Sequence, residues 1–382
     1  MDVKQESLLM HEKLKGKLSV ISKVKVESSK DLSLAYTPGV AEPCIKINEN
    51  LEDVYKYTMK GNTVAVVTDG TAVLGLGDIG PEAAMPVMEG KCVLFKEFAD
   101  VDAFPICINS KDPDDIVKTV ELISPGLGGI NLEDISAPRC FEIEERLKKS
   151  LSIPVFHDDQ HGTAIVVLAG LINSLKLTGK KKESVRVVIN GAGSAGIAIT
   201  NLLLEFGIEE IIVCDKKGII SKDCDWLNPA QKKISCQTNP SGLNGTLSDA
   251  MQNSDVFIGV SAPGIVNSDM IKSMNKDAIV FAMANPVPEI FPDEAKAGGA
   301  RIIGTGRSDF PNQVNNVLAF PGIFKGALKC RSQITQKMKL AAAYAISEMI
   351  DENALSEESI LPKPFIPEIA DRVAEAVIKA AI

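Results

Sequence analysis

A glycine-rich turn between a strand-like run and a helix-like run constrains this chain most. Residues 184–190 form a short apolar run, and Gly191, Ala192, Gly193, Ser194, Ala195 and Gly196 follow, before a helical apolar repeat that continues to about residue 206. In such a turn the first glycine permits a tight bend, the second lets a pyrophosphate approach the main chain, and the third lets the helix pack on the strand. The phosphates then lie at the helix N-terminus. The segment predicts a Rossmann-type dinucleotide-binding domain.

An acidic residue ends the next strand-like run. Asp215 closes residues 210–215, about 20 residues beyond the glycines, where such domains place the acid that binds the adenosine ribose hydroxyls. This favours NAD. Lys216 and Lys217 follow directly and could neutralise the 2′-phosphate of NADP, so NADP stays open. The alternative is a glycine-rich turn that binds no nucleotide.

Two series of alternating strand-like and helix-like segments predict an α/β fold with two domains. The strand-like runs of the first series are residues 63–68, 104–108, 129–132 and 153–156, with helical spacing in 112–123 and 138–149. A helix is expected at 163–178, and the second series has strand-like runs at 184–190, 210–215, 255–260, 278–284 and 301–304. Such alternation is typical of βαβ units and parallel sheets.

We therefore expect an N-terminal α/β domain over residues 1–160 and a doubly wound Rossmann-type domain over residues 161–345. Helical spacing in residues 337–350 and 366–382 predicts C-terminal helices, with residues 346–382 packing back on the domains.

Charge and cysteine usage narrow the class of protein. The net charge of −9 over 382 residues offers no broad basic face, so we expect no nucleic-acid partner. The eight cysteines never form a Cys-X-X-Cys pair, as expected of reduced thiols in a cytosolic protein. Residues 1–17 are charged, and the longest apolar run, 163–175, is too short to span a bilayer. We expect a cytoplasmic protein without a membrane partner.

Two pairs of acids each follow a strand-like run of the first domain. Glu133 and Asp134 follow residues 129–132, and Asp158 and Asp159 follow residues 153–156 after His157. Because ligands of open α/β sheets bind at the carboxyl ends of the strands, the four acids should converge. Crowded carboxylates repel each other unless a cation is present, and an all-oxygen set suits Mg²⁺ or Mn²⁺.

Other interpretations of these acids remain open. Asp159 could cap a helix that begins near Thr163. His157 and His161 have the spacing of a helical zinc pair, but the intervening acids and Gly162 favour a turn at the strand end.

Several spaced motifs together resemble the malic enzyme family. In order between about residues 30 and 325 they are Tyr36-Thr37-Pro38-Gly39-Val40-Ala41, Val66-Val67-Thr68-Asp69-Gly70, Leu74-Gly75-Leu76-Gly77-Asp78-Ile79-Gly80, Asn131-Leu132-Glu133-Asp134, Asp158-Asp159-Gln160-His161-Gly162-Thr163, Ala284-Asn285-Pro286 and Asn315-Asn316. The chain is similar to the short, bacterial-type members, without a phosphotransacetylase-like domain.

The resemblance implies a role for each matching residue. It implies metal ligation by Glu133, Asp134 and Asp159, with Asp158 beside them. Lys91 matches the general base and Tyr36 the general acid. Asn285 and Asn316 match the residues that contact malate and the nicotinamide. One position departs from the pattern, because Ala72 stands where larger members carry an arginine that grips a substrate carboxylate; Arg139, Arg307, backbone amides or a neighbouring subunit could replace it.

The implied activity is oxidative decarboxylation of L-malate to pyruvate and CO₂ with NAD(P) and Mg²⁺ or Mn²⁺. For Lys91 to act as a base it must be neutral, and a nearby divalent cation lowers the pKa of an amine. The resemblance also implies decarboxylation of oxaloacetate and a homodimer, with Tyr36 serving its own subunit or the partner. The alternatives are a malolactic-type enzyme that forms lactate and a non-catalytic nucleotide-binding regulator.

Overall fold

The computed structural model contains two sheets of mainly parallel strands. It describes residues 2–73 and 75–382. Leu74, in one of the spaced motifs, and Met1 lie outside the described residues. The expected α/β class and both strand series are confirmed, with strand ends shifted by a few residues.

The first sheet has four parallel strands in the order β2-β1-β3-β4. The strands are β1 (Thr63–Thr68), β2 (Asp102–Cys107), β3 (Gly129–Leu132) and β4 (Val155–His157). Side chains of β1 alternate between two apolar layers. Val64 and Val66 belong to the core that contains α5 (Pro81–Ala99), and Ala65 and Val67 to the core of α6 (Pro113–Ile123) and α7 (Arg139–Ser150).

The second sheet has the order β10-β9-β8-β5-β6-β7. Its strands are β5 (Arg186–Asn190), β6 (Glu210–Asp215), β7 (Gly218–Ile219), β8 (Val256–Gly259), β9 (Ala278–Ala282) and β10 (Ala300–Thr305). The order reverses beside β5, so the turn after β5 lies at the point where such sheets bind ligands. The antiparallel β7 was not predicted, because two residues are too few for a periodic pattern.

Helix α8 (Asp158–Thr178) is longer than the sequence predicted. It begins directly after β4, so the interpretation of Asp159 as the cap of a helix starting near Thr163 is wrong, as is the turn expected around His161. Asp158 and Asp159 both lie in the first turn of α8, where the helix dipole favours negative charge. Although α8 has the length and composition of a membrane-spanning helix, most of it is buried inside the protein. The domain boundary expected after residue 160 falls in its first turn.

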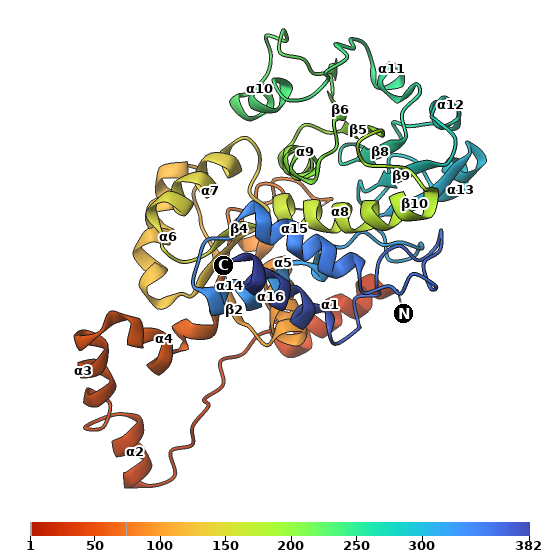
Figure 1. The fold of residues 1–382 in the computed structure, drawn as a ribbon. Helices are drawn as coiled ribbons and strands as arrows, with labels where there is room; N and C mark the ends of the chain where they lie inside the picture. The colour runs from red at the N-terminus through yellow and green to blue at the C-terminus, as the bar shows by residue number, and fades with distance from the viewer. Residues whose placement is uncertain (1, 74) are drawn as a thin grey trace.

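Three C-terminal helices contact both halves of the molecule (Figure 1). They are α14 (Phe320–Cys330), α15 (Gln336–Ser347) and α16 (Ile369–Ala380). Helices α14 and α16 contact each other and α5, whereas α15 contacts α8 and α9 (Ser194–Phe206). This packing places side chains of the C-terminal segment close to the start of α8.

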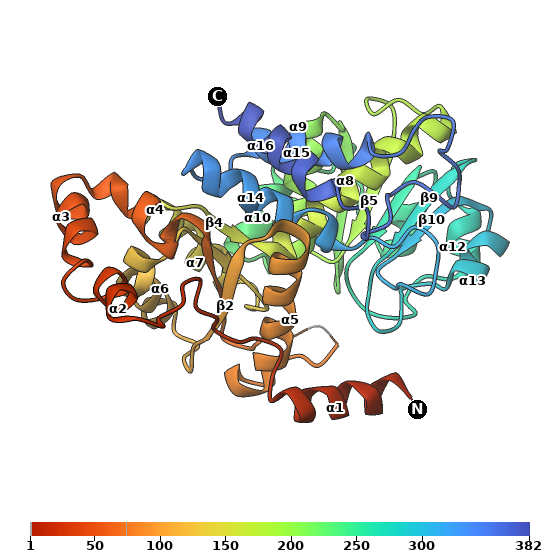
Figure 2. The same cartoon turned by 90° about the horizontal axis from the view of Figure 1, so that it is seen from below.

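The N-terminal residues project from the rest of the chain (Figures 1 and 2). Helices α2 (Ser29–Ala35), α3 (Ala41–Glu49) and α4 (Val54–Tyr57) form an arm beside the first sheet, and α1 (Val3–Leu14) lies apart from them. None of these four helices has a buried residue. Most of the exposed large hydrophobic side chains of the described residues lie between Val3 and Met59.

Candidate active site

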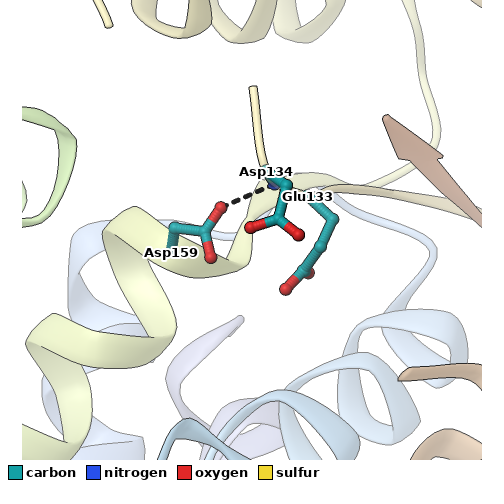
Figure 3. A group of neighbouring side chains, drawn as sticks. All are labelled: Glu133, Asp134 and Asp159. Carbon is teal, nitrogen blue, oxygen red and sulfur yellow. Dashed lines mark hydrogen bonds between the residues drawn. The ribbon is translucent and has the colours of Figure 1, made fainter. Parts of the chain in front are cut away.

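Three carboxylates from the ends of β3 and β4 converge (Figure 3). Glu133, Asp134 and Asp159 each offer one oxygen, and these oxygens lie within 4.8 Å of one another. The backbone N–H of Asp134 donates to Oδ2 of Asp159 over 2.8 Å. Asp134 has a φ of 53°, a left-handed conformation that aspartate tolerates better than most residues. The turn after β3 thereby brings Asp134 to the start of α8.

Glu133 and Asp134 are buried and Asp159 is partly exposed, and their negative charge is poorly compensated. Burial, with the neighbouring carboxylates, raises the pKa of Asp134 to about 9, and burial raises the pKa of Asp159 to about 6. Burial also raises the pKa of Glu133. Oδ2 of Asp134 is a buried oxygen without a hydrogen-bond partner among the described residues. An all-oxygen site with excess negative charge fits a hard divalent cation such as Mg²⁺ or Mn²⁺.

Lys91 reaches this cluster from α5. Its Nζ lies 2.6 Å from Oδ2 of Asp158 and 2.9 Å from Oε1 of Glu133, and it lies 4.2 Å from the centroid of the Phe320 ring. Burial lowers the pKa of Lys91, but Asp158 and Glu133 raise it more, so the pKa lies above its usual value. Lys91 is therefore an ammonium here. The neutral form that a base requires is favoured only when further positive charge enters the site.

Asn316 joins the same cluster from the second half of the chain. It lies in the short 3₁₀ helix η4 (Asn316–Leu318), and its Nδ2 donates to Oδ2 of Asp158. Asn285 follows β9 at the carboxyl edge of the second sheet, where Pro286 approaches Gly75 of the first domain: a Cβ on Gly75 would lie 3.4 Å from Cδ of Pro286. Loops of the two domains thus meet at Gly75 and Pro286, and Asn316 contacts Asp158.

The glycine-rich turn connects β5 to α9, as its sequence predicted. Gly191 has a φ of 117°, and a Cβ there would lie 2.5 Å from the carbonyl oxygen of Val260. A Cβ on Gly196 would lie 1.7 Å from the carbonyl oxygen of Gly191. At Gly193 a Cβ would meet no heavy atom within 4 Å. The fold requires the first and third glycines, whereas the second leaves space open in front of Ser194 and Ala195, at the start of the helix.

Asp215 ends β6, beside this turn. Its Oδ1 accepts from the backbone N–H of Lys217 over 2.7 Å, and its Oδ2 accepts from Nε1 of Trp226 over 3.0 Å. Nζ of Lys217 lies 4.7 Å from the Trp226 ring centroid. Of the two lysines that could neutralise a phosphate, Lys217 is therefore held against the indole.

Family models divide the chain as its two sheets do. Residues 15–148 match the malic enzyme N-terminal domain, and residues 160–382 match the malic enzyme NAD binding domain. The chain belongs to the malic enzyme family. It is 58% identical to the bifunctional malic/malolactic enzyme of Bacillus subtilis, over 100% of this chain and 94% of that protein. It is 56% identical to the NAD-dependent malic enzyme of Geobacillus stearothermophilus, over 100% of this chain and 79% of that protein.

A solved structure agrees with this assignment. The crystal structure of the NAD-dependent malic enzyme of Thermotoga maritima has a TM-score of 0.94 and 48% identity, covering 99% of each chain. The resemblance inferred from the spaced motifs is thereby confirmed.

One residue matched to the family motifs lies away from the carboxylates. Tyr36 directly follows α2, which lies on the projecting arm (Figure 2), and 67% of the Tyr36 surface is exposed. Among the other matched residues, Lys91 and Asn316 both contact Asp158. The arm therefore separates Tyr36 from Lys91 within one chain.

The two arginines considered in place of Ala72 both have partners. Nη2 of Arg139 donates to Oδ2 of the buried Asp69 over 2.7 Å and to Oγ1 of Thr71 over 3.0 Å. Arg307 pairs with Asp309 and donates to the carbonyl oxygen of Pro286. Arg139 therefore contacts the residue directly before Ala72, and Arg307 the residue directly after Asn285.

Sequence reasoning missed three residues that support the site. Nδ2 of Asn131 donates to Oε2 of Glu133 over 2.8 Å, and the spacing of two along a strand could have indicated it. Glu144 takes a core-facing position of α7, with Ile143 and Leu147, and a carboxylate in such an apolar stripe was a usable signal. Lys339 takes a similar core-facing position of α15, with Ala342 and Ala343, and gave the same signal, but its partner His161 comes from a distant segment.

Proposed function

We propose that this chain catalyses the metal-dependent oxidative decarboxylation of L-malate to pyruvate and CO₂ with NAD as oxidant. The observation that carries the proposal is the oxygen cluster of Glu133, Asp134 and Asp159 beside the Lys91–Asp158 pair. The names of the Bacillus and Geobacillus relatives support this reaction. Eight free cysteines in the described residues support a cytoplasmic location.

Each site residue has a proposed task. Glu133, Asp134 and Asp159 hold Mg²⁺ or Mn²⁺, and the backbone of Gly191 to Gly196 holds the cofactor pyrophosphate. A cation bound there would supply Lewis-acid polarisation of the C2 oxygen of malate, and NAD would supply the acceptor for the hydride from C2.

Lys91 removes the proton of the C2 hydroxyl, because added positive charge beside Glu133 favours its neutral form. Asp158 orients Lys91, and Asn316 orients Asp158 and, with Asn285, the substrate. The C3–C4 bond then breaks with release of the C4 carboxylate as CO₂, and Tyr36 delivers a proton to C3. Arg139 is the cation proposed for a substrate carboxylate, since it contacts Thr71 beside Ala72.

The cofactor preference follows from Asp215. Its carboxylate lies at the end of β6, where it would accept hydrogen bonds from the ribose hydroxyls and repel a 2′-phosphate. The relative from Geobacillus is named NAD-dependent, whereas more distant relatives, such as that of Haemophilus influenzae at 48% identity, are named NADP-dependent. We therefore propose NAD as the preferred cofactor.

A malate oxidation assay tests the reaction. Purified protein is supplied with malate and either NAD or NADP, with and without Mn²⁺, and reduced cofactor, CO₂ and carbon product are measured together. We expect pyruvate and one NADH per malate, only with the cation. Cofactor binding without metal dependence or turnover would instead favour a non-catalytic regulator.

A malolactic activity is the second candidate, because the Bacillus subtilis relative is named bifunctional. In that reaction the cofactor stays bound and is reoxidised, so lactate leaves without free NADH. Lactate as the main product, without accumulating NADH, would favour this candidate over the first.

We further propose that the enzyme is a homodimer in which the arm of one subunit brings Tyr36 to the carboxylates of the other. Helices α1 to α4 bury no residue of their own, and Leu34, Tyr36 and Leu51 are among the exposed side chains of this N-terminal segment. An apolar surface of this kind is typical of a protein contact. Within one chain, Tyr36 lies away from Lys91.

Mixed dimers test the source of Tyr36. Differently tagged Tyr36→Phe and Lys91→Ala subunits are coexpressed, and the doubly tagged dimers are isolated. If Tyr36 acts on the partner, one site of each mixed dimer is intact, and we expect about half of the wild-type activity per dimer. If Tyr36 acts within its own subunit, both sites are defective and the mixed dimers stay inactive. Light scattering measures the oligomeric state.

A further inference from the structure

Two buried charged side chains and one partly buried histidine meet at the first turn of α8. Nε2 of His161, in α8, is 2.8 Å and 3.0 Å from the two carboxylate oxygens of Glu144, in α7. Nζ of Lys339, in α15, is 2.9 Å from Nδ1 of the same ring. We call Glu144, His161 and Lys339 the α8 clamp. Its three members come from three helices and meet at one imidazole.

The contacts fix the tautomer of His161. A carboxylate only accepts and an ammonium only donates, so Nε2 carries the hydrogen and Nδ1 accepts. Burial lowers the pKa of His161 to about 3, which agrees with a neutral ring. The neutral imidazole therefore links an acid on one side to a lysine on the other without bearing charge itself.

The clamp holds the segment that carries two site acids. Oε1 of Glu144 also accepts from the backbone N–H of His157 over 3.3 Å, and His157 is the N-cap residue of α8 without a side-chain cap of its own. Glu144 thus binds the chain just before Asp158 and, through His161, just after Asp159. The position of both acids depends on a helix of the first domain and on one from the C-terminal segment.

The burial of the clamp argues against a role in stability alone. Glu144 is 6% exposed and Lys339 4% exposed. Lys339 lies on the apolar face of α15 with Met338, Ala342 and Ala343. Apolar residues often replace such buried charged groups without loss of stability, because burying charge is unfavourable. Burial, with the nearby positive charge of Lys148, lowers the pKa of Lys339 to about 7.

We infer that Glu144, His161 and Lys339 are positioning residues that keep Asp158 and Asp159 in the geometry needed for cation binding and turnover. For the effect on turnover, this inference rests on the proposed function. The expected effect on the affinity for the cation does not depend on it. Because Lys339 lies in α15, this C-terminal helix also helps to position the site acids.

Paired substitutions at His161 test the clamp. The amide of His161→Gln can donate to Glu144 and accept from Lys339, whereas His161→Leu can do neither. We expect His161→Leu and Lys339→Met to lower both Mn²⁺ affinity and kcat at least about tenfold, as loss of outer contacts to metal ligands does. His161→Gln should retain most of both. KM for NAD should change little, because the glycine-rich turn is untouched.

Lys180→Met is the matched control. Lys180 follows the other end of α8, and its Nζ pairs with Oδ1 of Asp255 over 2.6 Å, with both side chains mostly buried. This variant also removes a shielded lysine from an ion pair, but it should leave kcat and Mn²⁺ affinity unchanged. Mn²⁺ affinity is measured from the electron paramagnetic resonance signal of the free ion, and thermal unfolding is followed for every variant.

The outcomes are distinguishable. Near-normal Mn²⁺ affinity and kcat in His161→Leu and Lys339→Met, with only a lower Tm, would show a structural role and overturn the inference. Equal losses in His161→Gln and His161→Leu would also contradict it. If wild-type protein fails to oxidise malate, the proposed function fails, but the comparison of Mn²⁺ affinities still decides the role of the clamp. If a variant fails to fold, the remaining pairs give the same comparison.

Discussion

At the carboxyl edge of the four-stranded sheet the candidate ligand groups are side chains, whereas at that of the six-stranded sheet they are backbone amides. We call the first the acidic edge, formed by Glu133, Asp134, Asp158 and Asp159. The second is the glycine edge, formed by residues 191–196. The acidic edge brings carboxylates from separate segments of the chain together in a largely buried site. The glycine edge is one continuous turn in which close backbone contacts exclude side chains.

The two edges should therefore lose ligand binding in response to different kinds of substitution. The acidic edge should be sensitive to the loss of charge at constant shape, since its ligand is a cation. The glycine edge should be sensitive to added volume at constant charge, because a Cβ at Gly196 or Gly191 meets backbone atoms. Substitutions that remove charge from the acidic edge, or add volume to the glycine edge, test this difference.

The largest effect is expected from Asp159→Asn. The amide keeps the shape but removes a negative charge from the oxygen cluster. We expect kcat to fall about 10³-fold, because several kcal/mol of charge stabilisation are lost. Steady-state kinetics at saturating Mn²⁺ measures the fall, and NAD binding followed by calorimetry should stay normal. A loss of NAD binding equal to the loss of turnover would contradict the separation of the two edges.

The next largest effects are expected at the glycine edge, where Gly196→Ala and Gly193→Ala should differ in their effect on Tm. A Cβ at Gly196 would lie 1.7 Å from a carbonyl oxygen, so Gly196→Ala should lower Tm and weaken NAD binding. Gly193 has open space around it, so Gly193→Ala should leave Tm unchanged and raise KM for NAD about tenfold or more, because the pyrophosphate needs that space. Gly126→Ala, at another open position, is the control. Normal cofactor binding in Gly193→Ala would place the pyrophosphate elsewhere.

The pH dependence of ligand affinity should also differ between the two edges. The pKa of Asp134 is raised to about 9 and that of Asp159 to about 6, so protons compete with the cation below these values. Mn²⁺ affinity should therefore rise with pH from 6 towards 9, by up to about tenfold per unit. Titration calorimetry in several buffers gives the affinity and the protons released. NAD affinity should stay comparatively flat, since backbone amides do not titrate; a flat Mn²⁺ profile would count against cation binding at Asp134.

The smallest effect is expected from Asp215→Asn. This change removes the charge that repels a 2′-phosphate but keeps a side-chain oxygen for the N–H groups of Lys217 and Trp226. The ratio of kcat/KM for NAD to that for NADP should fall about tenfold. Lys216→Met, a neighbouring charge change of opposite sign, should not lower this ratio. An unchanged ratio in Asp215→Asn would remove Asp215 from cofactor selection.

The glycine edge could be predicted almost completely from the sequence. The strand, the turn and the helix up to Phe206 were all found, because each depends on backbone conformation and apolar spacing within a few residues. The parallel strands and the convergence of Glu133, Asp134 and Asp159 also followed, since parallel sheets align the carboxyl ends of their strands.

Three features depended on contacts that local patterns do not encode. The first turn of α8 was missed, because the acids and Gly162 resembled a turn while the chain continued from β4 into a helix. The ion pair of Lys91 with Asp158 sets the protonation of the proposed base. Tyr36 was assigned by its motif, but its place on the arm depends on how the N-terminal helices extend.

The sequence by itself therefore determined the two parallel sheets, the nucleotide turn and the identity of the acids, because these follow from short-range periodicity and from residue chemistry. Only the tertiary structure decided which side chains support them. Lys339 meets His161 and Glu144 across three helices that are distant in the chain. Such buried polar contacts are selected by packing and desolvation, which act on the folded chain as a whole.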